Sequence, residues 1–157
     1  MHGALAAAGH TLAVAESLTA GRLSAVLADA PGASETFRGG VVAYATEVKA
    51  SVLAVDERLL TAEGAVHRDV AGQMAQGVRR LMGASYGLAT TGVAGPATQD
   101  GQEVGTLFVA VCGPLGDTVV GAPHTDGDRH RDAVCRAAVI AALELLRDRL
   151  RPSDRDG

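Results

Sequence analysis

The sequence predicts an α/β protein, and three observations support this prediction. Short apolar runs that suit buried strands alternate with segments whose apolar residues recur at helical spacing. Ala, Val, Leu and Gly dominate and only four aromatic residues occur, so layers of structure can pack closely. Two β-rich runs late in the chain, 104–112 and 117–122, flank Gly113-Pro114-Leu115-Gly116. This pattern predicts a hairpin, and therefore at least one antiparallel pair in the sheet.

The remaining elements follow in the order typical of this fold class. A strand at 11–15 leads through a polar turn into a helix that Pro31 and Gly32 terminate. A strand at 39–45 precedes a helix that Thr46 can cap. The other expected elements are a short helix at 1–9, a helical turn at 56–60, a loop at 63–66, a helix at 68–82, a strand at 86–90, a small-residue loop at 91–96, a polar and mobile loop at 97–103, a charged loop at 126–131, a final helix, and a frayed tail at 147–157.

Length and composition limit the class of protein. The 157 residues suffice for a single domain, spanning 1–157, with its own core. The net charge of −4 argues against a nucleic-acid partner, and no apolar run is long enough to span a membrane, so we expect a small-molecule partner in the cytoplasm. Cys112 and Cys135 lie in apolar patterns and are expected in the core, not in a disulfide or a zinc site. Neither a metal nor another cofactor is expected.

The segment Ala15-Glu16-Ser17-Leu18-Thr19-Ala20-Gly21 joins the first strand to its helix. Ser17 lies at the strand end, and the amides of residues 19–22 are expected to open the helix and point outward. Such a turn can present a serine as a nucleophile and can hold an anion on its free amides. In the alternative interpretation Ser17 or Thr19 only caps the helix, which is the ordinary role of these residue types.

Lys49 is the only lysine among the 14 Lys and Arg residues. Arg stays protonated at any accessible pH, whereas a desolvated Lys can become a neutral amine and act as a base. A chain that otherwise uses Arg therefore has a chemical reason to keep Lys at this position. The alternative is a solvated lysine with no special role.

Several strand ends are predicted to converge at one edge of the sheet, where ligands of open α/β sheets bind. They bring together Ser17, Tyr44 with Lys49 in the following helix, and the loop 91–96, while Arg131 arrives from a later loop. The small residues of 91–96 let backbone approach a ligand, although a plain turn explains them equally well. All five histidines (His2, His10, His67, His124 and His130) are expected to be exposed. Lys49, with Tyr44 relaying or orienting a proton, is then the simplest base for Ser17.

These motifs resemble the C-terminal domain of the competence/damage-inducible CinA proteins and their stand-alone relatives, the nicotinamide mononucleotide deamidases. The resemblance covers nearly the whole chain. The residues that carry it are the segment from Ala15 to Gly21, Val41-Val42-Ala43-Tyr44 with Lys49 five residues on, Thr91-Gly92-Val93-Ala94-Gly95-Pro96, Val104-Gly105-Thr106, and Arg131-Asp132-Ala133-Val134.

The resemblance implies a three-layer α/β/α sandwich with a mixed, mostly parallel sheet, and a homodimer. It implies hydrolysis of nicotinamide mononucleotide to nicotinate mononucleotide and ammonia. The roles it implies are Ser17 as nucleophile, Lys49 as base, Tyr44 as helper, Thr91 as a substrate-binding residue and Arg131 as the ligand of the phosphate. To these we add the hypothesis that amides around Thr19, Ala20 and Gly21, or at Gly92, stabilise the oxyanion, and that Gly95 belongs to the substrate-binding loop.

Departures from the family's usual motifs leave alternatives open. The usual Ser-Cys-Thr-Gly-Gly reads Ser-Leu-Thr-Ala-Gly at 17–21, so Leu18 excludes a cysteine nucleophile there, and the methyl group of Ala20 could narrow the pocket or weaken activity. The Gly-Asp-Arg that usually precedes the last helix is present as Gly127-Asp128-Arg129, but Arg131 fits the spacing that follows this motif better. Either Arg129 or Arg131 is therefore the phosphate ligand. The alternative functions are a weak or inactive nucleotide-binding module of the same family and a hydrolase that acts on another amide.

Overall fold

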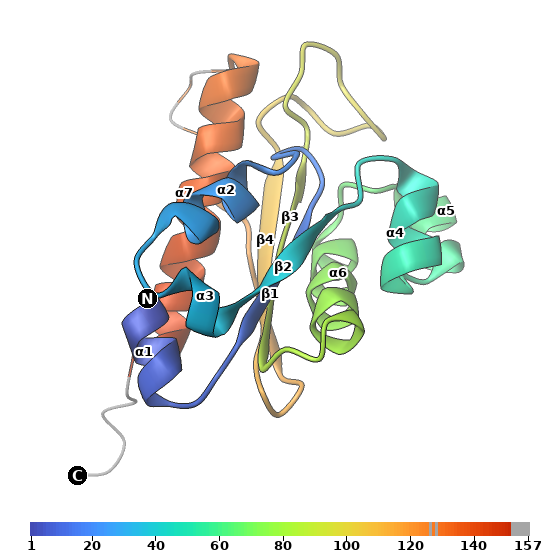
Figure 1. The fold of residues 1–157 in the computed structure, drawn as a ribbon. Coiled ribbons are helices and arrows are strands. Elements are labelled where there is room, and N and C mark those ends of the chain that lie inside the picture. The colour runs from blue at the N-terminus through green and yellow to red at the C-terminus, as the bar shows by residue number, and fades with distance from the viewer. Residues whose placement is uncertain (126, 128, 152–157) are drawn as a thin grey trace, which may run out of the picture.

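A five-stranded mixed sheet forms the middle layer of the molecule (Figure 1). In chain order its strands are β1 (Leu12–Glu16), β2 (Phe37–Val42), β3 (Tyr86–Gly92), β4 (Leu107–Cys112) and β5 (Thr118–Gly121). Their order across the sheet is β2-β1-β3-β4-β5. β1 pairs in parallel with β2 and β3, while β4 pairs antiparallel with β3 and β5. Within the described sheet, therefore, β4 alone runs against the other strands, and the prediction of a mostly parallel mixed sheet is confirmed.

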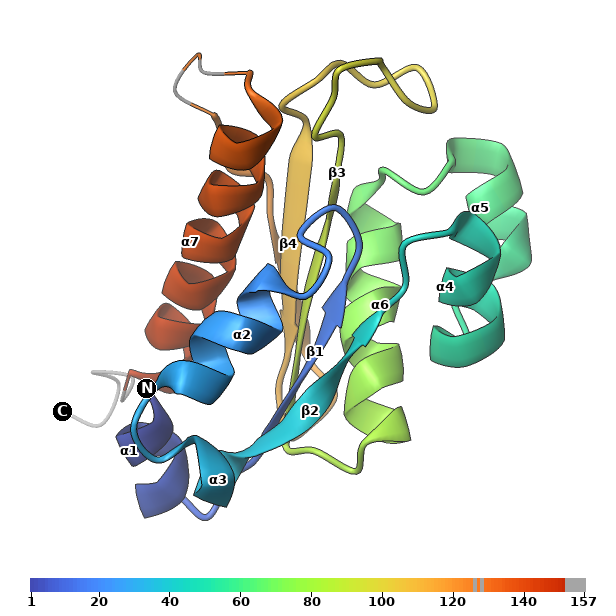
Figure 2. The same cartoon turned by 45° about the horizontal axis from the view of Figure 1, so that its top comes forward.

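The computed structural model describes residues 1–125, 127 and 129–151, and its helices cover both faces of the sheet (Figure 2). One face carries α1 (His2–Ala7), α2 (Arg22–Asp29), α3 (Ala33–Thr36) and α7 (Arg131–Leu150). The other carries α4 (Thr46–Leu53), α5 (Glu57–Glu63) and α6 (Arg68–Leu81). The molecule is thus a three-layer α/β/α sandwich. None of the helices in the described ranges combines the length and hydrophobicity needed to cross a bilayer.

Side-chain alternation along the central strands divides the core between the two faces. In β1, Leu12 and Val14 belong to an apolar cluster with α2 and α7, whereas Ala13 and Ala15 belong to a cluster with α4 and α6. Every residue of β1 and β3 is buried, as expected for strands covered on both sides. The two strands that end at the candidate site are therefore the best-packed strands of the sheet.

The structure moves several predicted boundaries. β2 spans 37–42 rather than 39–45, so Tyr44 follows the strand instead of ending it. β4 begins at Leu107 rather than at residue 104, because residues 104–106 still belong to the loop that precedes it. The predicted hairpin between β4 and β5 is confirmed, and Gly113 donates its amide to the carbonyl of Asp117 at 2.8 Å.

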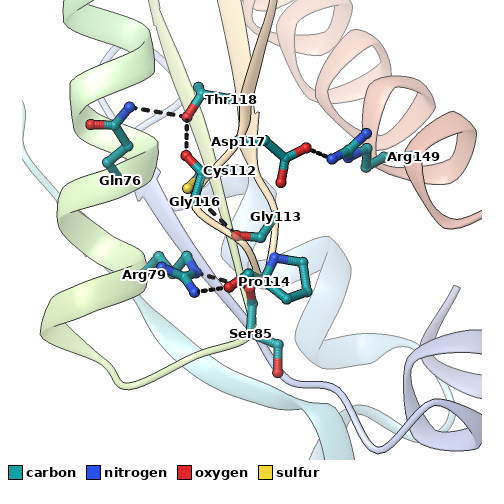
Figure 3. Close-up of polar contacts among 10 residues, drawn as sticks. All are labelled: Gln76, Arg79, Ser85, Cys112, Gly113, Pro114, Gly116, Asp117, Thr118 and Arg149. Carbon is teal, nitrogen blue, oxygen red and sulfur yellow. Dashed lines mark hydrogen bonds and ion pairs between the residues drawn. The ribbon is translucent and has the colours of Figure 1, made fainter.

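The last helix continues to Leu150, so the frayed tail predicted at 147–157 is wrong for residues 147–150, while 152–157 lie outside the described residues. Two contacts hold this end of α7. Leu146 is fully buried, and Arg149 forms an ion pair with Asp117 of the β4–β5 hairpin (Figure 3). Arg79 of α6 contacts the same hairpin by donating to the carbonyl of Pro114 (Figure 3). It also donates to the carbonyl of Ser85, just before β3. Side chains of the two outer layers thus clamp the hairpin between them.

The segment 97–103, expected to be a mobile loop, contains a small hairpin. Gln99 and Gln102 exchange backbone hydrogen bonds of 3.2 and 2.8 Å. The two residues between them, Asp100 and Gly101, have φ values of 52° and 73°, the left-handed pair found in type I′ turns. Asp-Gly is a preferred pair for such a turn, so this dipeptide was the sequence signal for the hairpin.

Candidate active site

Ser17 follows β1 directly and lines a pocket of 260 Å³ at the edge of the sheet. Its amide donates to the carbonyl of Thr90 at 3.0 Å, which fixes its backbone to β3. The residue is 8% exposed, and among the described residues its hydroxyl makes no hydrogen bond with a backbone group of the helix. The other lining residues are Leu18, Tyr44, Arg131 and all of 92–99. The predicted convergence of these segments is therefore present.

Glu16 is the residue of this site that the sequence reasoning missed. Its side chain is fully buried and receives five hydrogen bonds. One carboxylate oxygen accepts from the Thr19 hydroxyl and from the amides of Gly21 and Leu23, and the other accepts from the amide and hydroxyl of Ser24. A carboxylate is favoured at a helix N-terminus, and here it caps α2 in place of Ser17 or Thr19. A buried acid just before a turn rich in small and hydroxyl residues was the available signal.

This cap changes which amides of the turn can bind an anion. The amide of Gly21 donates to Glu16, that of Arg22 to the carbonyl of Thr19, and that of Ala20 to the carbonyl of Ser17. The prediction that the amides of residues 19–22 point outward is therefore wrong for Ala20, Gly21 and Arg22. Within the described part of the chain, only the amides of Leu18 and Thr19 in this turn make no hydrogen bond.

Thr19 and Ala20 do not line the pocket formed by the described residues. Thr19 is fully buried, and its hydroxyl is also within 2.8 Å of the Thr90 hydroxyl. Ala20 is exposed and has a φ of 47°, in the left-handed region that favours glycine. Its methyl group therefore strains the turn and does not narrow the pocket.

Lys49 is buried, at 1% exposure, one turn into α4. Its amine donates to the carbonyl of Ala43 at 2.8 Å and to that of Tyr44 at 3.3 Å. Burial lowers the pKa of Lys49 from 10.5 to about 8, although Asp100 and Glu47 oppose the shift. The alternative of a solvated lysine is thus wrong.

Lys49 and Ser17 lie at the same edge of the sheet without touching. The amide of Ala43 donates to the carbonyl of Glu16 at 2.8 Å. Ala43, whose carbonyl accepts from Lys49, therefore lies beside Glu16, the residue that precedes Ser17. Among the described residues, however, the Ser17 hydroxyl has no hydrogen bond with the Lys49 amine. The Lys49 side chain comes from α4, and its amine is hydrogen-bonded to the backbone carbonyls of Ala43 and Tyr44.

Tyr44 and Arg131 meet at the mouth of the pocket, which both residues line. Arg131 donates to the Tyr44 hydroxyl at 2.6 Å and to the carbonyl of Gly95 at 2.9 Å. Its hydrogen bond with Tyr44 raises the pKa of Arg131, so the guanidinium remains charged. Both side chains are exposed at this position. A permanent cation is therefore held at the entrance, as the placement of a phosphate ligand requires.

Arg129 lies elsewhere. Its guanidinium is 3.5 Å from the carboxylate of Glu103, and it lines a neighbouring groove. Of the two candidate arginines, only Arg131 lines the Ser17 pocket in the described part of the chain. Asp128, from the Gly-Asp-Arg segment, lies outside the described residues.

The loop after β3 shapes the pocket, but Thr91 does not reach it. Thr91 is buried, and its hydroxyl donates to the carbonyl of Ala65 at 2.8 Å. A Cβ at Gly92 would lie 2.5 Å from the carbonyl oxygen of Thr106, and one at Gly95 would lie 2.9 Å from Val104. Gly92 is therefore required by the close approach of backbone, and Gly95 by its φ of 85° and by the Val104 side chain, although both also line the pocket.

One predicted exposed histidine is buried. His2 is 4% exposed, and its ring nitrogens lie 2.6 Å from the Thr36 hydroxyl and 2.9 Å from the carbonyl of Leu27. It packs where α1 meets α3, on the helical layer away from Lys49. His2 therefore serves the packing of this layer, and the expectation that all five histidines are exposed is wrong.

The fold and the site define an α/β protein with a pocket at the carboxyl ends of its parallel strands. The chain matches the family described as CinA C-terminal domain over residues 1–150. The chain belongs to this family.

Known relatives agree in sequence and in structure. A CinA-like protein of Frankia casuarinae is 58% identical over 137 residues, and one of Gloeobacter violaceus is 46% identical over 140 residues. These matches cover 87% and 88% of this chain but 31% and 33% of the relatives, so the chain spans about a third of their length.

Solved structures of the same superfamily share the fold. A CinA superfamily protein from Klebsiella pneumoniae 700603 superposes with a TM-score of 0.87 at 32% identity, covering 94% of this chain and 91% of that one. The competence/damage inducible protein CihA from Agrobacterium tumefaciens gives a TM-score of 0.88 at 31% identity, covering 94% and 89%.

Proposed function

We propose that this chain is an amidohydrolase that converts nicotinamide mononucleotide to nicotinate mononucleotide and ammonia, with Ser17 as nucleophile and Lys49 as base. The observation that carries the proposal is the state of Lys49, a buried amine at the sheet edge that also holds Ser17. Its pKa of about 8 leaves part of the amine neutral near pH 7. A general base works best when its pKa lies close to the operating pH.

The reaction balances with these two residues and water. Ser17 Oγ attacks the carboxamide carbon while its proton passes to Lys49. The tetrahedral intermediate expels ammonia, which takes the proton back from Lys49 and leaves an ester on Ser17. Water then attacks this ester with Lys49 accepting its proton, and the proton returns to Ser17 as the carboxylic acid leaves.

The lysine must reach the serine for this sequence to work. In the free protein its amine is held by the carbonyls of Ala43 and Tyr44. The proposal requires that, with substrate bound, the amine contacts Ser17 Oγ directly or through one water. Catalytic hydrogen bonds are often long in free enzymes and tighten in the complex.

The pocket offers groups for the two charges of the reaction. The amide of Leu18, which lines the pocket and donates to no described residue, is the proposed donor to the oxyanion. Arg131 is the proposed ligand of the substrate phosphate, since it is charged and lines the entrance. A guanidinium has five N–H donors, so Arg131 can bind a phosphate while it keeps its contact with Tyr44.

Ammonia release from nicotinamide mononucleotide tests the proposal. We expect steady release by the native chain, loss of activity in Ser17→Ala, and loss in Lys49→Arg because Arg cannot accept the proton. Full activity of Lys49→Arg would remove Lys49 as the base. Release from other carboxamides alone would replace the substrate and keep the mechanism.

A second function is favoured by one observation. The described structure contains no hydrogen bond between Ser17 and Lys49, which is also what a nucleotide-binding module without turnover would show. Calorimetric binding of nicotinamide mononucleotide without any ammonia release would support the module.

A further inference from the structure

The backbone of Ala65, between α5 and α6, is held by two residues that are distant in sequence. Its amide donates to a carboxylate oxygen of Asp100 at 2.8 Å, and its carbonyl accepts from the Thr91 hydroxyl at 2.8 Å. Asp100 lies in the turn of the 99–102 hairpin, whereas Thr91 belongs to β3. The loop that lines the Ser17 pocket and the strand that precedes this loop are therefore both hydrogen-bonded to the backbone of one residue, Ala65.

The surroundings of Asp100 are shaped to admit this contact. A Cβ at Gly64 would lie 2.4 Å from the Cβ of Asp100, so only glycine leaves room for the aspartate. The left-handed φ of Asp100, followed by Gly101, turns the hairpin so that its tip meets Ala65. Asp and Asn adopt this conformation more readily than other side chains that have a Cβ.

The same carboxylate acts on the buried amine. Burial lowers the pKa of Lys49, and two carboxylates oppose that shift: Asp100, which has the larger effect, and Glu47 of α4 itself. Glu47 belongs to the helix of the lysine, so its distance from Lys49 is set by that helix. Asp100 comes from the pocket loop, so its effect on Lys49 depends on the position of that loop.

We propose that Asp100 is a positioning residue of the site: it holds the pocket loop onto Ala65, and this contact keeps its carboxylate where its charge acts on Lys49. The proposal rests on the proposed function only for its kinetic consequences. The loop contact and the charge effect are properties of the folded chain and can be measured without turnover.

Two substitutions separate the roles. Asp100→Asn keeps an oxygen that can accept from the Ala65 amide and keeps the turn, but removes the charge. Asp100→Ala removes the charge and the hydrogen bond. Glu103→Gln is the matched control, because Glu103 lies in the same loop and pairs with Arg129 instead of acting on Lys49.

The measurement uses the single lysine of the chain, since protein labelled with ¹³C-lysine gives one lysine signal to follow against pH. We expect the pKa of Lys49 to fall below 8 in both Asp100 variants and to stay near 8 in Glu103→Gln. Hydrogen exchange of the Ala65 amide should be about tenfold faster in Asp100→Ala alone, as loss of a hydrogen bond to a charged group predicts.

The KM for nicotinamide mononucleotide should rise in Asp100→Ala and stay close to native in Asp100→Asn. In Asp100→Asn the acid limb of the pH–rate profile should move down with the pKa of Lys49.

Unchanged lysine titration in Asp100→Asn would overturn the charge role. Unchanged Ala65 exchange and KM in Asp100→Ala would overturn the loop role. If no variant, the native chain included, releases ammonia, the proposed function fails, while the lysine titration and the Ala65 exchange still decide the role of Asp100.

Discussion

Arg131 and Tyr44 lie 87 positions apart in the sequence, and their side chains meet at the pocket mouth with 2.6 Å between guanidinium nitrogen and phenol oxygen. The contact joins the first turn of α7 to the segment between β2 and α4. Among the described residues, the Tyr44 hydroxyl is hydrogen-bonded to Arg131 and to neither Ser17 nor Lys49. The geometry of the free protein therefore favours Tyr44 as a support for Arg131 over Tyr44 as a relay between Ser17 and Lys49.

Tyr44→Phe tests this interpretation. The ring remains as a wall of the pocket, but Arg131 loses one hydrogen bond, which is worth about 1 kcal/mol. We expect the KM for nicotinamide mononucleotide to rise about fivefold with kcat nearly unchanged, measured by steady-state ammonia release. Tyr86→Phe, at the opposite end of β3, is the control and should leave both constants unaltered. A large fall in kcat with native KM would restore the relay role.

Lys49 should make stability depend on pH in the alkaline range. Its pKa is about 8 in the folded protein and 10.5 in the unfolded chain, so the unfolded chain binds more protons between these two pH values. The free energy of unfolding must then rise with pH across this window. The contribution of Lys49 amounts to about 3 kcal/mol over the full interval, at 1.36 kcal/mol per pKa unit.

Urea denaturation of the native chain and of Lys49→Met from pH 7 to 10.5 measures this contribution. Other groups titrate equally in both proteins, so the difference between the two curves isolates Lys49. The native chain should gain stability relative to Lys49→Met as the pH rises through 8. Parallel curves would mean that Lys49 is not desolvated in solution.

Glu16 should be among the most sensitive positions for stability. Glu16→Gln leaves one acceptor oxygen and places an amide NH₂ group among donors that the carboxylate now satisfies. We expect a loss of about 3 kcal/mol in the free energy of unfolding, because buried donors lose a charged acceptor. Glu144→Gln, on the exposed face of α7, should stay within about 0.5 kcal/mol of native. An equal effect of the two substitutions would show that the buried cap contributes nothing.

The layers of the fold were predictable because they depend on local pattern. Buried strands such as 86–90 and amphipathic helices such as 68–82 are determined by the spacing of apolar residues, which is visible in the sequence. The end of α7 was missed because it depends on a contact with Asp117, about thirty residues earlier. The arginines near the end of α7 are typical of a solvated tail, and the partner of Arg149 is brought to it only when the layers pack together.

The candidate site shows the same division. The prediction that strand ends and loops converge at one edge of the sheet was enough to bring Ser17, Tyr44 and Arg131 to one pocket. The hydrogen-bond partners were not predictable. The carboxylate of Glu16 accepts from turn amides that were expected to bind a ligand, and the Thr91 hydroxyl donates to the carbonyl of Ala65. Which polar group a neighbour satisfies is a property of the packed structure, and residue type alone leaves several partners possible.

Ala20→Gly tests whether the unusual alanine matters for stability or for binding. Its φ of 47° is left-handed, which costs a residue with a Cβ about 1–2 kcal/mol, while glycine loses about 0.5–1 kcal/mol more in entropy. We expect Ala20→Gly to raise the free energy of unfolding by about 1 kcal/mol, and to leave the KM unchanged, because Ala20 does not line the pocket among the described residues.

Glycine substitutions at two other alanines serve as controls for Ala20→Gly. Ala54, at the end of α4, also has a left-handed φ of 56°, so Ala54→Gly should stabilise the chain to a similar degree. Ala25 is exposed within α2, where Ala25→Gly should cost about 1 kcal/mol because glycine is a poor helix former. Urea denaturation of the three variants gives the order. If Ala20→Gly instead behaved like Ala25→Gly, the turn after Ser17 would not be left-handed in solution, and the assignment of the Leu18 amide to the oxyanion would fail with it.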